Sequence, residues 1–136
     1  MRSATILVVD DHEDTRDFLE YLLRTEGYDL AMAADGEQAI TLYRERPFDV
    51  VVLDIFMPRK DGVQTIVELR REFPDAAIIA MSADSTFGRQ NALARARDAG
   101  ALYTIRKPLE PWVLLRAIEG LVMARRSRAM RLKAVS

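Results

Sequence analysis

Apolar residues follow two spacings along this chain. Short runs rich in valine, isoleucine and leucine are typical of buried strands. They alternate with longer segments whose apolar residues lie three or four positions apart, as on one face of a helix. The runs predict strands over residues 5–9, 28–33, 50–53, 77–81 and 102–105. The periodic segments predict helices over residues 15–26, 36–46, 63–73, 87–99 and 112 to about 124.

Strands that alternate with helices predict an α/β fold, in which helices cover both faces of a parallel sheet. The run VVVL at residues 50–53 is apolar throughout, which favours a strand buried on both faces. Right-handed crossovers leave few topologies for five such units. We expect a doubly wound, flavodoxin-like (βα)5 sheet with strand order 2-1-3-4-5. Ligands of such a sheet bind at the carboxyl ends of the strands, between the first and the third.

Polar residues follow four of the five predicted strands. They are Asp10 and Asp11 after the first, Asp54 after the third, Ser82 after the fourth and Lys107 after the fifth. Three crowded carboxylates repel one another unless a cation joins them, and Mg²⁺ prefers such oxygen ligands. A lysine binds phosphate as a point charge, and a serine hydroxyl donates to phosphoryl oxygens. The set is typical of phosphoryl transfer onto a carboxylate.

Each of these residues also has a simpler structural explanation. Asp10 and Asp11 could supply the negative charge that a helix N-terminus favours. Asp54 could be a turn residue, and Lys107 with Pro108 could form a surface turn. All these groups are predicted to lie at one edge of the sheet, which favours one shared site over a separate structural role for each residue.

The chain resembles the receiver domain of two-component response regulators over about residues 6–122. The segments ILVVDDHEDTR, VVLDIFMPRKDG, MSA and AGALYTIRKPL carry the resemblance. It implies that Asp54 is the phosphoacceptor. It also implies that Asp10, Asp11 and Asp54 hold Mg²⁺ together with the backbone carbonyl of Phe56.

The resemblance assigns further roles at the strand ends. Ser82 would sense the phosphoryl group, and Lys107 would pair with it. Phe56 and Asp84 would flank the path of an attacking water molecule. A bulky Phe56 is therefore expected to lengthen the life of the phosphorylated state.

Two positions depart from the family pattern, and the milder departure is Ser82, which replaces the commoner Thr and keeps the hydroxyl. Receiver domains usually carry Tyr or Phe three residues before the lysine, where this chain has Thr104, and Tyr103 lies one residue earlier. Because side chains alternate along a strand, Tyr103 should point to the opposite face from Thr104. The signal could pass through Tyr103 if the strand has a bulge, through residues 83–99, or through selection of the active state by a partner. We favour residues 83–99.

Composition excludes several other classes of protein. The 136 residues include no Cys and one His, which excludes disulfide frameworks and thiolate or poly-histidine metal centres. No apolar stretch approaches the length of a membrane span, and no signal peptide is evident, so we expect a cytoplasmic protein. Residues 121–136 carry five basic and no acidic residues, which leaves a net charge of −6 on the other 120 residues. An acidic body is atypical of nucleic-acid-binding domains.

These patterns predict a receiver domain over residues 1–124 and a basic tail over residues 125–136. The expected function is a stand-alone signalling switch, not an enzyme in the usual sense, although it assists its own phosphorylation and slow dephosphorylation. The expected partners are a sensor histidine kinase or a histidine phosphotransfer protein and a downstream protein. A homodimer through the fourth helix, fifth strand and fifth helix is a further partner hypothesis.

Two other functions fit parts of the pattern. A phosphatase of the haloacid dehalogenase type also uses a nucleophilic Asp on a doubly wound sheet, but it needs D-x-D after its first strand, where this chain has Asp10-Asp11-His12. A receiver fold that binds partners without phosphorylation usually lacks an acid or the lysine, and this chain has them all. Incubation with acetyl phosphate and Mg²⁺ separates this last alternative from a phosphorylated switch.

Overall fold

The structure is a computed structural model that describes residues 3–57, 61–83 and 92–135. Its sheet has five parallel strands in the order β2-β1-β3-β4-β5. The strands are β1 (Thr5–Val9), β2 (Asp29–Ala33), β3 (Val50–Asp54), β4 (Ile78–Ser82) and β5 (Tyr103–Arg106). The helices are α1 (Glu13–Thr25), α2 (Gly36–Glu45), α3 (Gly62–Glu72), α4 (Ala92–Ala99) and α5 (Pro111–Val135). The predicted doubly wound fold and strand order are confirmed.

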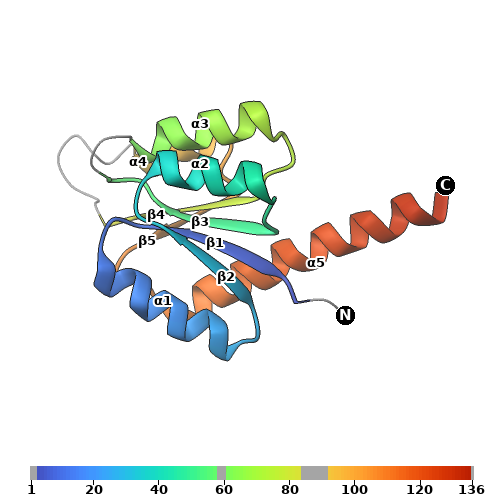
Figure 1. Ribbon diagram of the computed structural model, residues 1–136, viewed down its shortest axis with the longest axis horizontal. Coiled ribbons are helices and arrows are strands. Elements are labelled where there is room, and N and C mark those ends of the chain that lie inside the picture. The colour runs from blue at the N-terminus through green and yellow to red at the C-terminus, as the bar shows by residue number, and fades with distance from the viewer. Residues whose placement is uncertain (1–2, 58–60, 84–91, 136) are drawn as a thin grey trace.

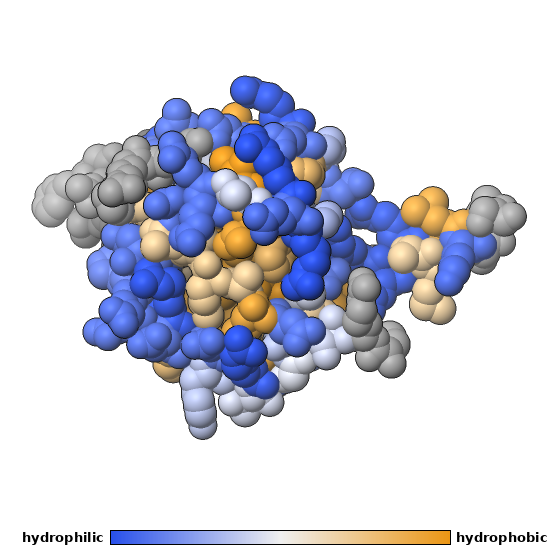
Figure 2. Space-filling model, viewed as in Figure 1, coloured by the Kyte–Doolittle hydropathy of each residue, from blue (hydrophilic) through white to orange (hydrophobic). Residues whose placement is uncertain are grey.

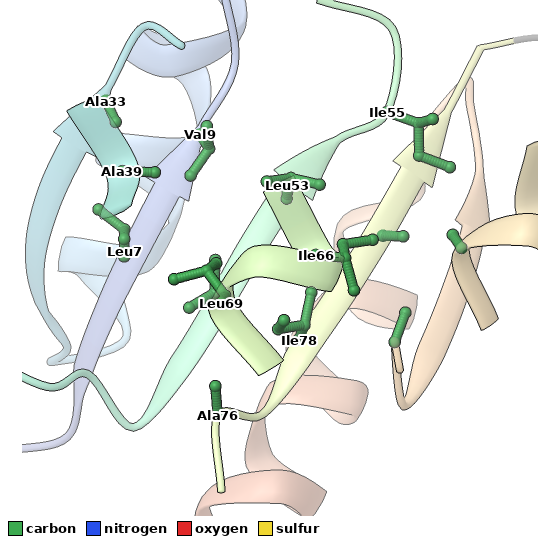
Figure 3. Close-up of a cluster of buried hydrophobic side chains, with 14 of the residues drawn as sticks. Leu7, Val9, Ala33, Ala39, Leu53, Ile55, Ile66, Leu69, Ala76 and Ile78 are labelled. Atoms are coloured by element: carbon green, nitrogen blue, oxygen red, sulfur yellow. The ribbon is translucent and has the colours of Figure 1, made fainter. Parts of the chain in front are cut away.

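Helices cover the sheet on both faces, with α2, α3 and α4 on one side and α1 and α5 on the other (Figure 1). Alternate residues of each strand therefore enter two different cores. Figure 3 shows Leu53 and Ile78 of neighbouring strands facing Ile66 and Leu69 of α3. On the other face Val52 joins a second cluster that includes residues of α1 and α5. All five positions of β3 are buried, as its continuous apolar run predicts.

Local signals fix most of the element boundaries. Asp35 accepts a hydrogen bond from the backbone N–H of Gln38 at 2.8 Å and begins α2. Gly27 follows α1 with a positive φ of 89°, a conformation that glycine adopts without a steric penalty. The observed boundaries therefore lie close to the predicted ones for α1, α2, α3 and all five strands. Residues 87–91 of the predicted fourth helix lie outside the described residues.

Helix α5 extends well beyond the apolar pattern of its first half. It continues from Pro111 to Val135, so no break in the helix separates the predicted domain from the predicted tail. Arg125 anchors the middle of the helix, because its guanidinium donates to the backbone oxygen of Asp75 at 2.8 Å. Arg128, one turn further along, lies 3.9 Å from Oδ1 of Asp75. Beyond it the helix extends away from the body, and both Met130 and Leu132 are exposed to solvent (Figures 1 and 2).

Within the described ranges, no helix is long and apolar enough to cross a membrane. Even α5, the longest, carries basic side chains along its second half.

Candidate functional site

Three aspartates meet where β1 and β3 end. In the parallel register Val9 lies beside Leu53, so the residues that follow them, Asp10 and Asp54, become neighbours. The side chain of Asp10 is fully buried and that of Asp54 is 5% exposed. Asp11 lies at the rim, with 23% of its side chain exposed. The topology therefore buries carboxylates at the carboxyl edge of the sheet, as the sequence predicts.

Lys107 brings a positive charge to the same edge from β5. Its Nζ lies 3.3 Å from Oδ2 of Asp10 and 3.4 Å from Oδ2 of Asp54. The backbone holds the lysine in place, because its N–H donates to the carbonyl oxygen of Ser82 at 2.8 Å. The following peptide bond, to Pro108, is cis. One ammonium thus bridges two of the three carboxylates.

The surroundings of Asp54 disfavour the ionised form of its carboxyl group. Burial raises the pKa of Asp54, and the negative charge of Asp10 raises it further. The ammonium of Lys107 and a hydrogen bond from the backbone N–H of Phe56, at 3.2 Å from Oδ1, oppose this rise in pKa without cancelling it. A further cation bound beside Asp54 would therefore stabilise the ionised carboxylate.

The carboxylates fit a divalent cation. One donor atom from each of Asp10, Asp11, His12 and Asp54 lies within 4.8 Å of the others. Oδ1 of Asp11 is buried and accepts no hydrogen bond from the described residues, although Nδ1 of His12 lies 3.1 Å away, and a cation would satisfy this oxygen. Asp10, Asp11 and Asp54 are therefore the residues that would hold Mg²⁺. The ion would neutralise the carboxylates and bind phosphoryl oxygens.

His12 is a member of this cluster that the sequence analysis did not include among the site residues. Its Nδ1 lies 3.2 Å from Oδ1 of Asp10 and 3.1 Å from Oδ1 of Asp11. Its backbone N–H also donates to Oδ1 of Asp10 at 2.9 Å. The only sequence signal was its place directly after two aspartates, because the direction of a loop side chain depends on backbone angles that no periodicity reveals.

A close backbone approach positions the loop after Asp54. A Cβ on Gly62 would lie 2.5 Å from Cα of Ile55 and 2.8 Å from the carbonyl oxygen of Asp54, so glycine is required there. The N–H of Gly62 donates to the carbonyl oxygen of Ile55 at 2.9 Å, and Asp61 caps α3. The start of α3 is thereby fixed against the end of β3.

The remaining predicted site residues fall around this centre. Ser82 ends β4 and is fully buried, one position past the partner of Asp54 in the register. Phe56 is half-buried and packs at the edge of one core cluster. Asp84 lies outside the described residues.

Thr104 and Tyr103 lie on opposite faces of β5, as the alternation along a strand predicts. Oγ1 of Thr104 accepts a hydrogen bond from the guanidinium of Arg97 on α4 at 2.9 Å. The hydroxyl of Tyr103 instead lies over Gly120 of α5. The register of β4 with β5 is continuous, without the bulge that would turn Tyr103 toward the site. The position of the usual aromatic residue is thus tied to α4 by a hydrogen bond.

Residues 6–119 match the family of response regulator receiver domains. The chain belongs to this family. As a receiver domain it is a phosphoacceptor regulator rather than an enzyme in the usual sense, and its acidic cluster is typical of the receiver Mg²⁺ site.

Solved structures agree with this assignment. The receiver domain of NtrX from Brucella abortus is 29% identical, with a TM-score of 0.79 over 87% of this chain and 98% of that one. The signal receiver domain of an HD domain-containing protein from Pseudomonas fluorescens Pf-5 is 26% identical, with a TM-score of 0.86 over 96% of this chain and 95% of that one. A CheX–CheY–BeF3–Mg²⁺ complex from Borrelia burgdorferi is 29% identical, with a TM-score of 0.79 over 87% of this chain and 88% of that one.

Proposed function

We propose that this receiver domain is a phosphorylation switch in a two-component phosphorelay, with Asp54 as the phosphoacceptor. The observation that carries the proposal is the placement of Asp54. It is buried beside two further aspartates, and the ammonium of Lys107 lies 3.4 Å from its Oδ2. Such a site attracts a cation and then a phosphoryl group, whose charges complement those already present.

The chemical step is transfer from a phosphohistidine. A carboxylate oxygen of Asp54 attacks phosphorus, the P–N bond breaks, and the released imidazole takes a proton from solvent. The product is an acyl phosphate on Asp54. Mg²⁺, held by Asp10, Asp11, Asp54 and the backbone carbonyl of Phe56, would neutralise the carboxylate and phosphoryl oxygens. Lys107 would pair with one phosphoryl oxygen.

Two side chains are proposed to set the lifetime of the acyl phosphate. Phe56 and Asp84 each follow a site residue by two positions in the sequence, which is the basis for proposing that they flank the approach of water, and Asp84 lies outside the described residues. An apolar Phe56 would hinder that approach and slow hydrolysis. The half-life of the phosphorylated protein should therefore be shorter in Phe56→Asn than in the parent, and an equal or longer half-life would contradict this role.

The signal is proposed to leave the site through residues 83–99 rather than through Tyr103. The ring of Tyr103 lies on the α5 side of the sheet, whereas Ser82 ends β4 and the chain that follows it leads to α4. Thr104 would take part through its hydrogen bond from Arg97. A beryllofluoride mimic should therefore shift amide signals of residues 83–99 equally in the parent and in Tyr103→Ala, and loss of that response in Tyr103→Ala would identify Tyr103 as the switch residue.

The proposed upstream partner is a sensor histidine kinase or a histidine phosphotransfer protein, since the reaction needs a phosphohistidine donor. The downstream partner is proposed to be a protein. A second copy of the chain, bound through α4, β5 and α5, is the oligomeric form to test by sedimentation with and without beryllofluoride. The compartment proposed for this exchange is the cytoplasm.

Intact-mass measurement after incubation with acetyl phosphate and Mg²⁺ tests the proposal. We expect a gain of one phosphoryl group in the parent and no gain in Asp54→Asn. Asp49→Asn is the matched control, because Asp49 precedes the same strand at its opposite end and should leave labelling intact. Labelling that persists in Asp54→Asn would contradict the assignment. No labelling in the parent would favour a receiver that binds partners without phosphorylation.

A further inference from the structure

The metal cluster contains one group that is not an oxygen donor. His12 is the N-cap residue of α1, yet its side chain makes no capping hydrogen bond to the helix. The imidazole instead faces the carboxylates of Asp10 and Asp11, on the side away from Lys107. Since it is 67% exposed, it lies where an ion arriving from solvent would first meet the site.

The distances match a shared coordination shell. Ligand atoms about 2.1 Å from an octahedral ion are about 3.0 Å apart at adjacent corners and about 4.2 Å apart at opposite corners. Nδ1 of His12 lies 3.2 Å and 3.1 Å from the two Oδ1 atoms, close to the spacing of adjacent corners. The full set of four donors lies within 4.8 Å, so a small contraction would close it on one ion.

The two carboxylate oxygens of Asp10 have different neighbours in the site. Its Oδ1 faces His12, whereas its Oδ2 lies 3.3 Å from Nζ of Lys107. A cation on the Oδ1 side therefore does not have to displace the lysine. Oδ1 of Asp11, which is buried and accepts no hydrogen bond from the described part of the chain, lies on this same side, 3.1 Å from His12.

We infer that His12 is a fourth side-chain ligand, through Nδ1, beside the three aspartates, and that it allows this site to bind a divalent transition-metal ion such as Zn²⁺ as well as Mg²⁺. Imidazole nitrogen suits Zn²⁺ and its neighbours in the transition series, whereas Mg²⁺ prefers oxygen and keeps several waters. His12 should therefore raise the affinity for Zn²⁺ far more than the affinity for Mg²⁺. The inference rests on the metal site of the proposed function and adds a ligand to it.

Calorimetric titration with Zn²⁺ and, separately, with Mg²⁺ tests the inference. The measured quantity is the affinity for Zn²⁺ divided by the affinity for Mg²⁺. In His12→Asn the amide can still donate to the carboxylates but cannot offer an imidazole nitrogen. The ratio of Zn²⁺ affinity to Mg²⁺ affinity should therefore fall roughly tenfold or more. Glu13→Gln is the control, because it removes a neighbouring exposed charge and no ligand, and its ratio should equal that of the parent.

A ratio in His12→Asn that does not fall would overturn the inference. An unchanged ratio, whether both affinities persist or both fall by the same factor, would mean that the imidazole acts only through hydrogen bonds or charge. The proposed function fails independently, through absence of acetyl phosphate labelling in the parent, because the affinity ratio requires no phosphorylation.

A spectroscopic measurement identifies the ligating atom directly. His12 is the only histidine in the chain, so its imidazole ¹⁵N signals need no assignment by mutation. Zn²⁺ should shift the Nδ1 signal strongly, and Mg²⁺ should leave it close to its position in the metal-free protein. A Zn²⁺ shift confined to Nε2 would place the ion outside the carboxylate cluster and overturn the inference.

Discussion

Strand β3 has an aspartate at each end, Asp49 just before it and Asp54 as its last residue, and the two lie in opposite environments. Asp49 accepts hydrogen bonds through Oδ2 from the backbone N–H of Thr5 at 2.8 Å and from its hydroxyl at 3.3 Å. The guanidinium of Arg125 lies 3.7 Å from Oδ1, and 37% of the side chain remains exposed. Its charge is shared among donors and water.

Asp54 is buried, with only 5% of its side chain exposed to water. Among the described residues, it accepts hydrogen bonds from the backbone N–H of Phe56 at 3.2 Å and from the ammonium of Lys107 at 3.4 Å, and it shares that ammonium with Asp10. The same residue type therefore stabilises the fold at the amino end of the strand, and at the carboxyl end it is available to bind a ligand. The comparison indicates that burial together with long contacts to its charge distinguishes the proposed phosphoacceptor from the structural aspartate.

The largest effect is expected when Lys107 is removed. Lys107→Ala leaves Asp10 and Asp54 without their shared cation, so the metal-free protein should lose about 2 kcal/mol of unfolding free energy. Urea unfolding in EDTA measures the loss, and added Mg²⁺ should restore part of it. Arg116→Ala removes an exposed cation from α5 and should change stability by less than about 0.5 kcal/mol. An equally small effect of Lys107→Ala would mean that solvent already compensates the carboxylates.

Asp49→Asn should weaken the opposite end of the strand. The loss of charge-assisted hydrogen bonds should lower the unfolding free energy by about 1 to 1.5 kcal/mol. Because Asp49 lies far from the metal cluster, this loss should be the same with Mg²⁺ and with EDTA. A loss that depended on Mg²⁺ would show that the two ends of the strand are coupled.

Asp54→Asn should have the opposite sign and raise the unfolding free energy of the metal-free protein by about 1 kcal/mol at pH 7. Burial raises the pKa of Asp54 in the folded protein, so its contribution favours folding below the unfolded value near 4 and is lost as pH rises through the folded pKa. Asparagine has no such dependence. The gain should therefore shrink when unfolding is measured below about pH 4, and a gain independent of pH would contradict this explanation.

The smallest effect is expected from truncation of α5 after Arg126. The shortened protein keeps Arg125, and it loses an exposed ion pair in which Arg128 lies 3.9 Å from Asp75. Such a pair contributes about 0 to 0.5 kcal/mol, so thermal unfolding and acetyl phosphate labelling should be nearly unchanged. Arg125→Ala in the full chain is the comparison and should cost more. A large loss on truncation would mean that the end of the helix supports the domain.

The sequence by itself determined the fold and most of the site. Periodicity located the ten elements, and the rules for parallel sheets placed the carboxyl ends of β1, β3, β4 and β5 at one edge. That was enough to bring Asp10, Asp54 and Lys107 together, although Lys107 is 97 residues from Asp10 in the sequence. These features follow from backbone geometry and hydrophobic burial, which leave their mark in residue order.

The tertiary structure alone decided what depends on the direction of individual side chains. Examples are the imidazole of His12 between two carboxylates, the hydrogen bond from Arg97 to Thr104, and the contact that makes Gly62 necessary. The contrast between Asp49 and Asp54 belongs to the same group, since both are aspartates beside one apolar run in the sequence. Their difference arises from which donors the other strands and helices bring within about 3 Å, and a linear pattern of residue types does not encode that distance.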